Sequence, residues 1–153
     1  MVYFGYPQAH EDDPQRAVRA GLAILEDMGR LNIKLKADQD LELGVRIGVH
    51  TGLVVAGEMG GGDTVEALAI VGETPNIAAR LQEAAEPNSV VISDVTANLI
   101  QGFFLCEAMG AHELKGISQP MELFQVVAES GAQTRFEVAA ASQLTPLVGR
   151  EQA

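Results

Sequence analysis

The sequence contains no tryptophan and a single cysteine, and both shortages narrow the classes of protein to which it can belong. With Cys106 alone, no disulfide can form within the chain and no zinc site can be built from cysteines. Cys106 ends an apolar stretch, residues 103–106, where a cysteine is most often a small core residue. Because aromatic residues make up only 5% of the chain, the hydrophobic core must be mainly aliphatic.

Basic residues are also scarce, since ten Lys and Arg stand against 21 Asp and Glu, a formal net charge of −11. Nucleic acids and anionic membranes bind clustered positive charge, so both are disfavoured as partners. No apolar run approaches the ~20 residues that a membrane-spanning helix needs, and no secretory signal is visible. We therefore expect a cytoplasmic protein, with an anionic ligand only where a few cations converge.

The remaining composition is that of about one globular domain, because 47% of the 153 residues are hydrophobic and 20% are charged. Residues 2–6 predict a short strand. Asp13 as N-cap and Pro14 in the first turn are typical of a helix start, and residues 34–40 predict a charged loop after that helix. Between them, apolar residues recur at helical spacing: Val18, Leu22, Leu25 and Met28.

The rest of the chain predicts mainly strands. Residues 43–57 predict a β-hairpin with Gly52 at its turn, and residues 66–71 predict a further apolar strand. A second helix is expected from Thr74. The last third predicts a buried strand at residues 89–93, a short helix capped by Asp94, and two late strands at 103–109 and 121–127. This order indicates an α+β fold, an antiparallel sheet with helices packed on it.

The residues best suited to chemistry stand at the start of the second helix. If Thr74 caps that helix, Asn76 and Arg80 lie four residues apart on one face. Free N–H groups of the first turn, an amide donor and a guanidinium fork together suit a polyphosphate. Lys115, beside Gly116 in a tight connection, can reach a phosphate too. Each of these residues taken alone is more often a solvated surface residue, and that alternative stays open.

Other candidate sites fit known chemistry less well. Residues 60–62 are glycines but lack the Gly-Lys-Ser/Thr that completes a phosphate-binding loop. The acidic residues 11–13 are best explained as a solvated helix start. The three histidines have no metal-ligand spacing, and His50 is expected to be structural; they are His10, His50 and His112.

Several segments, in the right order, resemble the catalytic domain of class III adenylate and guanylate cyclases. Residues 3–7 and 12–22 resemble the strand and helix that follow the second metal-binding aspartate of that family. Residues 45–52, Val-Arg-Ile-Gly-Val-His-Thr-Gly, resemble its central hairpin. Residues 71–81, Val-Gly-Glu-Thr-Pro-Asn-Ile-Ala-Ala-Arg-Leu, resemble its helix with the transition-state residues, and residues 114–116 resemble its last connection.

The resemblance implies a ferredoxin-like sheet and the conversion of a nucleoside triphosphate to a 3′,5′-cyclic nucleotide and pyrophosphate. It implies that Asn76 orients the ribose, that Arg80 stabilises charge on the reacting phosphates, and that Lys115 contacts the polyphosphate. Ala69 stands at the position that reads the base and is non-polar here. ATP is preferred over GTP by the resemblance alone.

The resemblance also implies cations and partners. The family binds Mg²⁺ or Mn²⁺ through two aspartates in its first strands, and this chain lacks both segments. We therefore expect no metal site, little turnover by this chain alone, and a homodimer that covers the exposed sheet edges.

Residues 1–128 are expected to be a partial cyclase domain and residues 129–153 a linker. Residues 144–151 resemble the beginning of an ATPase domain in large bacterial regulators, so the chain is interpreted as part of a multidomain signalling protein. Two alternatives stay open. One is a non-catalytic module that regulates an attached ATPase by dimerisation, and the other is a domain of this fold with no role in nucleotide binding.

Overall fold

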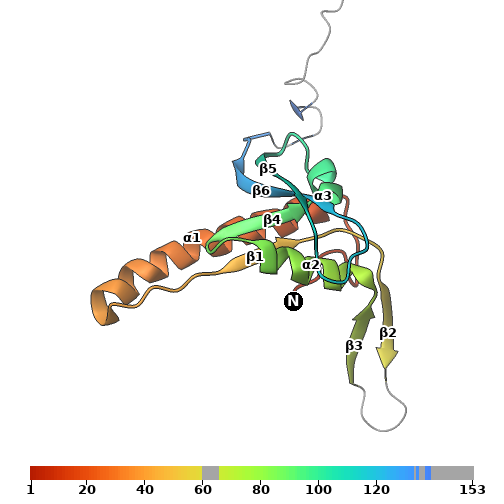
Figure 1. Cartoon of the computed structure of the whole chain (residues 1–153), viewed down its shortest axis with the longest axis horizontal. Helices are drawn as coiled ribbons and strands as arrows, with labels where there is room; N and C mark the ends of the chain where they lie inside the picture. Colours follow the sequence, from red (N-terminus) through yellow and green to blue (C-terminus); the bar gives the residue numbers. More distant parts are fainter. Residues whose placement is uncertain (60–65, 133, 135–136, 139–153) are drawn as a thin grey trace, which may run out of the picture.

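A computed structural model of the chain describes residues 1–59, 66–132, 134 and 137–138. Its helices and strands follow one another in the order α1 (Asp13–Gln39), β1 (Arg46–Val49), β2 (Val55–Met59), β3 (Glu66–Val71), α2 (Glu73–Ala84), β4 (Ser89–Ser93), α3 (Asp94–Leu99), β5 (Phe104–His112) and β6 (Met121–Glu129) (Figure 1). The α+β class expected from the sequence is confirmed. The glycine loop at 60–62 and the ATPase-like segment at 144–151 lie outside the described residues.

Four strands form one sheet, in the order β1-β4-β6-β5, and the other two form a separate ribbon, β2-β3. β1 runs parallel to β4, while β4, β6 and β5 are antiparallel to their neighbours, so the sheet is mixed rather than antiparallel as expected. The predicted hairpin at residues 43–57 is wrong for the same reason. Its two arms, β1 and β2, are strands of different sheets, and the β2-β3 ribbon projects from the body (Figure 1).

β4 contributes residues to both clusters of the hydrophobic core, and all five of its residues are buried, as the sequence predicted. Val90 and Ile92 pack in one cluster with Val18 of α1, whereas Val91 packs in a second cluster with Leu81 of α2. Successive side chains of a strand point to opposite faces of the sheet. The two helices therefore cover opposite faces of β4.

α1 is longer than expected, because residues 34–39 continue the helix instead of forming a loop. Its buried residues all lie in the first turns, at positions 13–21, and the remainder projects from the sheet (Figure 1). A projecting helix half is surrounded by water, so charged side chains are compatible with it. The helix ends where Asp40 adopts a left-handed conformation, with φ of 52°. The described helices include none long and apolar enough to cross a lipid bilayer.

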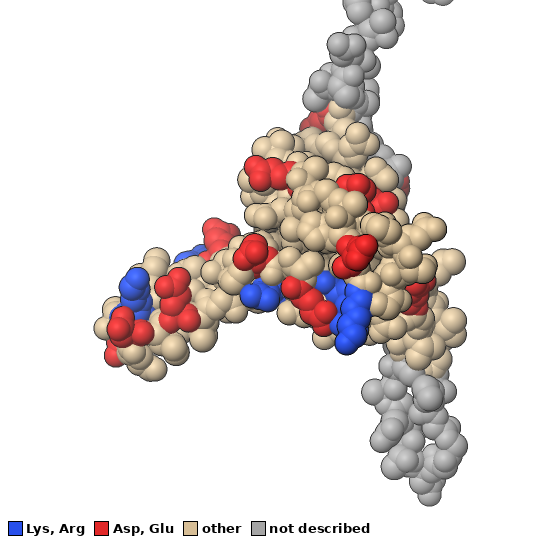
Figure 2. Space-filling view, viewed as in Figure 1, with Lys and Arg blue, Asp and Glu red and all other residues tan. Residues whose placement is uncertain are grey.

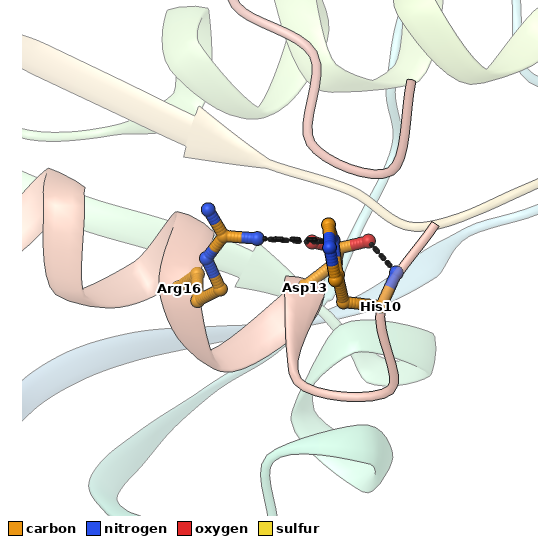
Figure 3. Close-up of polar contacts among 3 residues, drawn as sticks. All are labelled: His10, Asp13 and Arg16. Carbon is orange, nitrogen blue, oxygen red and sulfur yellow. Dashed lines mark hydrogen bonds and ion pairs between the residues drawn. The ribbon is translucent and has the colours of Figure 1, made fainter. Parts of the chain in front are cut away.

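The chain before α1 is held by a small polar cluster rather than by strand pairing. Residues 2–6 form no strand and pair with neither sheet, so the strand predicted there is wrong. Asp13 is the first helical residue and Asp12 the N-cap, one residue earlier than predicted. The Asp13 carboxylate accepts hydrogen bonds from the His10 N–H at 2.6 Å and from Arg16 Nη1 at 3.0 Å (Figure 3).

These donors also fix the charge of Asp13. The hydrogen bond from the His10 N–H is the main reason why the pKa of the Asp13 carboxyl lies below its ordinary value, although burial opposes the shift. The positive charge of Arg16 acts in the same direction. The carboxylate is thus engaged by the chain itself. Residues 12 and 13 do start the helix, but Asp13 is buried and not solvated as expected.

Candidate functional site

α2 carries two of the predicted site residues, and its start differs from the prediction. Gly72 is the N-cap, with φ of 142°, and Thr74 lies inside the helix. The Thr74 hydroxyl instead donates to the carbonyl oxygen of Leu53 at 2.7 Å. No side-chain hydrogen bond caps the first turn. The first backbone N–H groups of a helix have no partner within the helix, so those of α2 can donate to an external acceptor. Glu73 adds a negative charge at the same end.

The α2 helix packs unusually close to the sheet at Gly48 of β1. A Cβ atom on Gly48 would lie 2.4 Å from the Ala78 carbonyl oxygen and 2.4 Å from the Gln82 nitrogen. Only a residue without a side chain allows this approach of helix to strand. Ile77 and Leu81 are buried on the inner face of the helix. Asn76 is therefore left exposed and Arg80 partly exposed.

Arg80 is held by one neighbour on the surface of its own helix. Its Nη1 atom donates to both carboxylate oxygens of Glu83, at 2.7 and 2.8 Å. The Arg80 side chain is 32% exposed and that of Glu83 is 59% exposed. Ion pairs this open to water contribute only ~0–1 kcal/mol, because water screens them. A phosphate oxygen can therefore replace Glu83 at little energetic cost.

Lys115 lies on the connection between β5 and β6, and its side chain is exposed. Its neighbour Leu114 is buried in one cluster with Ile77 and Leu81 of α2. The structure thus brings this connection against α2. Lys115, Ser118 and Gln119 of the same connection line a hollow of about 470 Å³, to which no residue of α2 contributes. Among the described residues, no hydrogen bond or ion pair joins Lys115 to Asn76 or Arg80.

Ala69, the fourth predicted site residue, lies on the β2-β3 ribbon. Its register partner across the ribbon is Gly57. The ribbon is not part of the four-stranded sheet, and β3 leads through Gly72 directly into α2. Ala69 is therefore connected to the α2 site along the chain and has a glycine as its cross-strand neighbour.

The part of the chain that the structure describes contains no group of three or more His, Cys, Asp or Glu residues that could hold a metal ion. Figure 2 shows acidic side chains spread over one face of the molecule and basic ones both near α2 and on the projecting part of α1. The described residues therefore do not fit a pair of divalent cations. What the arrangement does offer is a set of hydrogen-bond donors for an anion.

Sequence reasoning singled out His50 as structural but missed the network around it. His50 Nδ1 lies 2.7 Å from Ser93 Oγ, and Thr51 Oγ1 lies 3.0 Å from Thr96 Oγ1. Burial lowers the pKa of the His50 imidazole, and the carboxylates of Asp94 and Glu73 act in the opposite direction. The only signal in the sequence was a Ser at the end of a buried strand, three residues before a Thr.

Comparison with known proteins shows which family the chain resembles. The model of the adenylate and guanylate cyclase catalytic domain family matches residues 1–128. An uncharacterized protein of Rhizobium meliloti is 32% identical over 141 residues, which are 92% of this chain and 13% of that protein.

Two solved structures are also similar. The adenylyl cyclase CyaB of P. aeruginosa has a TM-score of 0.75 and 32% identity, covering 81% of this chain and 64% of that one. The guanylate cyclase domain of RhGC from Catenaria anguillulae, solved in complex with GTP, has a TM-score of 0.70 and 30% identity, covering 82% and 65%. The chain thus spans less than two thirds of each of these relatives.

The close packing of α2 against Gly48 can be tested by substitution. In a Gly48→Ala variant, the added methyl group meets helix backbone, which cannot rotate away as a side chain does, so α2 must shift outward. We expect a loss of ~1–3 kcal/mol in the free energy of unfolding, the usual range for overpacking. Urea unfolding followed by circular dichroism measures it. Gly57→Ala, whose Cβ would meet no atom within 4 Å, is the matched control; equal stability of both variants would contradict the close contact.

Proposed function

Because the chain belongs to the adenylate and guanylate cyclase catalytic domain family, we propose that the exposed face of α2 binds the triphosphate of a nucleoside triphosphate. The complete catalytic domain then forms a 3′,5′-cyclic nucleotide and pyrophosphate. The proposal rests on the position of Asn76 and Arg80 on the outer face of α2. The inner face of this helix packs closely against the sheet. Among the residues that the structure describes, Arg80 is engaged by Glu83, and water screens this ion pair.

The roles of the residues follow from the charge that the reaction develops. The 3′-hydroxyl oxygen forms a bond to the α-phosphorus, the bond to the bridging oxygen breaks, and pyrophosphate leaves with the electron pair while the hydroxyl proton passes to solvent. Negative charge grows on the phosphate oxygens at that moment, and donors fixed in place stabilise it. We assign Arg80 to those oxygens, Asn76 to the ribose and Lys115 to the polyphosphate.

The family resemblance implies Mg²⁺ or Mn²⁺, and the described residues hold no ligand set for either. We therefore derive no step that uses the cations, and propose that this chain alone has negligible turnover. We also propose that residues 1–128 are part of the catalytic domain and that residues 129–153 lead to an ATPase domain.

The choice of base is also a proposal. Ala69 and its register partner Gly57 bring no polar side chain to the base-reading position of the ribbon. We propose ATP ahead of GTP, because the adenylyl cyclase is the more similar of the two solved domains described above.

A second candidate function is a regulatory module that keeps the fold, lacks turnover and controls an attached ATPase. It is favoured by Ala69, a non-polar residue at the position that the resemblance assigns to base reading. Both candidate functions use the same donors on α2, so the binding of a polyphosphate does not separate them, whereas turnover does.

Binding itself can be tested on this chain with inorganic tripolyphosphate and titration calorimetry. Arg80→Ala should weaken binding about tenfold or more, because a charge-assisted donor is lost. Glu83→Gln should strengthen it by up to about fivefold, because the competing carboxylate is removed.

The matched controls for this experiment are Arg30→Ala and Asp27→Asn. They remove an ion pair of the same spacing from the exposed part of α1. Equal effects of the α1 and α2 variants would mean that tripolyphosphate responds to total charge and that α2 holds no site.

Turnover can be tested in a chimera that places the N-terminal part of the P. aeruginosa CyaB catalytic domain before Met1. We expect cyclic AMP from ATP with Mg²⁺ or Mn²⁺, at a rate lowered at least about a hundredfold by Arg80→Ala, as for other single donors to a transition state. The α1 variant Arg30→Ala is again the control. A folded chimera without product from ATP or GTP would reject the cyclase and favour the regulatory module.

A homodimer is the third part of the proposal. Large hydrophobic side chains are exposed at the chain start, before the ribbon and at its first residue: Tyr3, Phe4, Tyr6, Leu53 and Val55. Within the described residues, β1 pairs only with β4, so its other edge is open. Apolar surface next to an open strand edge favours association. We expect sedimentation equilibrium to give a mass that doubles with concentration, and Leu53→Asp to weaken the dimer; a wild-type monomer at all concentrations would overturn this expectation.

A further inference from the structure

Two segments that are distant in sequence, residues 50–51 and 93–96, meet in a polar network. His50 directly follows β1, Ser93 ends β4, and Thr96 lies in the first turn of α3. β1 and β4 run parallel with Val49 opposite Ile92, so the next residues along, His50 and Ser93, come side by side. Their atoms Nδ1 and Oγ lie 2.7 Å apart. Ser93 and Thr96 are fully buried, which makes each of these hydrogen bonds expensive to lose.

The network continues from His50 to the start of α2. Residues 50–54 are anchored a second time, because Thr51 Oγ1 lies 3.0 Å from Thr96 Oγ1. The same segment then holds the helix, since the carbonyl oxygen of Leu53 accepts the Thr74 hydroxyl at 2.7 Å. Gly52 fits tightly between these groups: a Cβ on it would lie 2.5 Å from Thr74 Oγ1 and 3.3 Å from His50 Nε2.

We propose that His50 is a positioning residue, which holds residues 50–54 through Ser93 and thereby fixes the start of α2, the helix that carries Asn76 and Arg80. The meaning of Asn76 and Arg80 for a nucleotide rests on the proposed function. The positioning is a property of the chain without ligand and is tested separately. His50 touches no phosphate-binding side chain, and its effect passes through Leu53 and Thr74.

The chemistry of the ring specifies which nitrogen is used. Ser93 Oγ already accepts the N–H of Thr96 as the cap of α3, at 3.4 Å. The same oxygen lies 3.3 Å from Thr96 Oγ1, where either hydroxyl can be the donor. We assign the Ser93 hydrogen to His50 Nδ1, which puts the proton of the neutral ring on Nε2. Nitrogen NMR of the histidine side chains reports this tautomer directly, and we expect the Nε2–H form for His50.

Two substitutions separate the nitrogens. Asparagine places its amide near the position of Nδ1, whereas glutamine reaches the position of Nε2. His50→Gln should therefore speed amide hydrogen exchange at Asn76 and Ile77, the first hydrogen-bonded turn of α2, by about fivefold to tenfold, and His50→Asn should stay near wild type. Thr74→Val should match His50→Gln, and the double variant should exceed neither single variant, because both act on one chain of contacts.

His112→Gln is the control, since His112 bonds the Gly110 carbonyl oxygen on β5 and has no contact with this network. Unchanged exchange in both His50→Gln and Thr74→Val would overturn the proposal, as would equal effects of Gln and Asn at position 50. If His50→Gln does not fold, Thr74→Val decides alone, with faster exchange at α2 and unchanged exchange at β4 as the expected result.

Tripolyphosphate binding supplies the link to function. His50→Gln should weaken it about as much as it speeds exchange at α2, while His112→Gln leaves it unchanged. A wild-type chain that binds no tripolyphosphate would reject the proposed function, yet the exchange data would still decide whether His50 positions α2.

Discussion

The approach of α2 to β1 at Gly48 is the contact on which the remainder of the site depends. Helix backbone and strand backbone come so near that a Cβ would lie 2.4 Å from two main-chain atoms. That distance sets the depth of α2, lets Ile77 and Leu81 reach the core, and turns the opposite side of the helix to solvent. Because Arg80 and Asn76 occupy that side, the packing of α2 decides which face of the molecule they lie on. A donor set oriented in this way is organised before any ligand arrives.

Much of the fold could be predicted from the sequence because several elements carry their own signal. β4 is a continuous apolar run buried on both faces, and α2 combines helical spacing with a proline in its first turn. Strand partners were harder to predict. The alternating pattern at β1 marks a strand but contains nothing about its neighbour, and β1 pairs with β4, some 40 residues later, instead of with β2. Sequence distance favours the hairpin, whereas burial of β4 decides for the parallel pair.

The site was predictable to a lesser degree, since its parts obey different rules. Asn76 and Arg80 follow from helix periodicity, and the structure does place them on one exposed stretch of α2. Thr74 was predicted to cap the helix and does not, because Gly72 is the N-cap and the helix begins two residues earlier than Thr74 would allow. The Thr74 hydroxyl donates a hydrogen bond to the Leu53 carbonyl oxygen instead. The network around His50 depends on the register of two strands and on the start of a third element. No local pattern contains that register, so it emerged only in three dimensions.

The acidity of the chain explains why Arg80 is paired the way it is. In a chain with a net charge of −11, carboxylates outnumber guanidinium groups, and a buried carboxylate would hold Arg80 too strongly to be exchanged. Glu83, one helical turn away and more than half exposed, holds the side chain along α2 by a contact that water weakens. The pair keeps Arg80 oriented while leaving it open to a stronger acceptor. A phosphate group with several oxygens and more charge than one carboxylate is such an acceptor, which is why the same arginine can be ordered in the free chain and still serve a ligand.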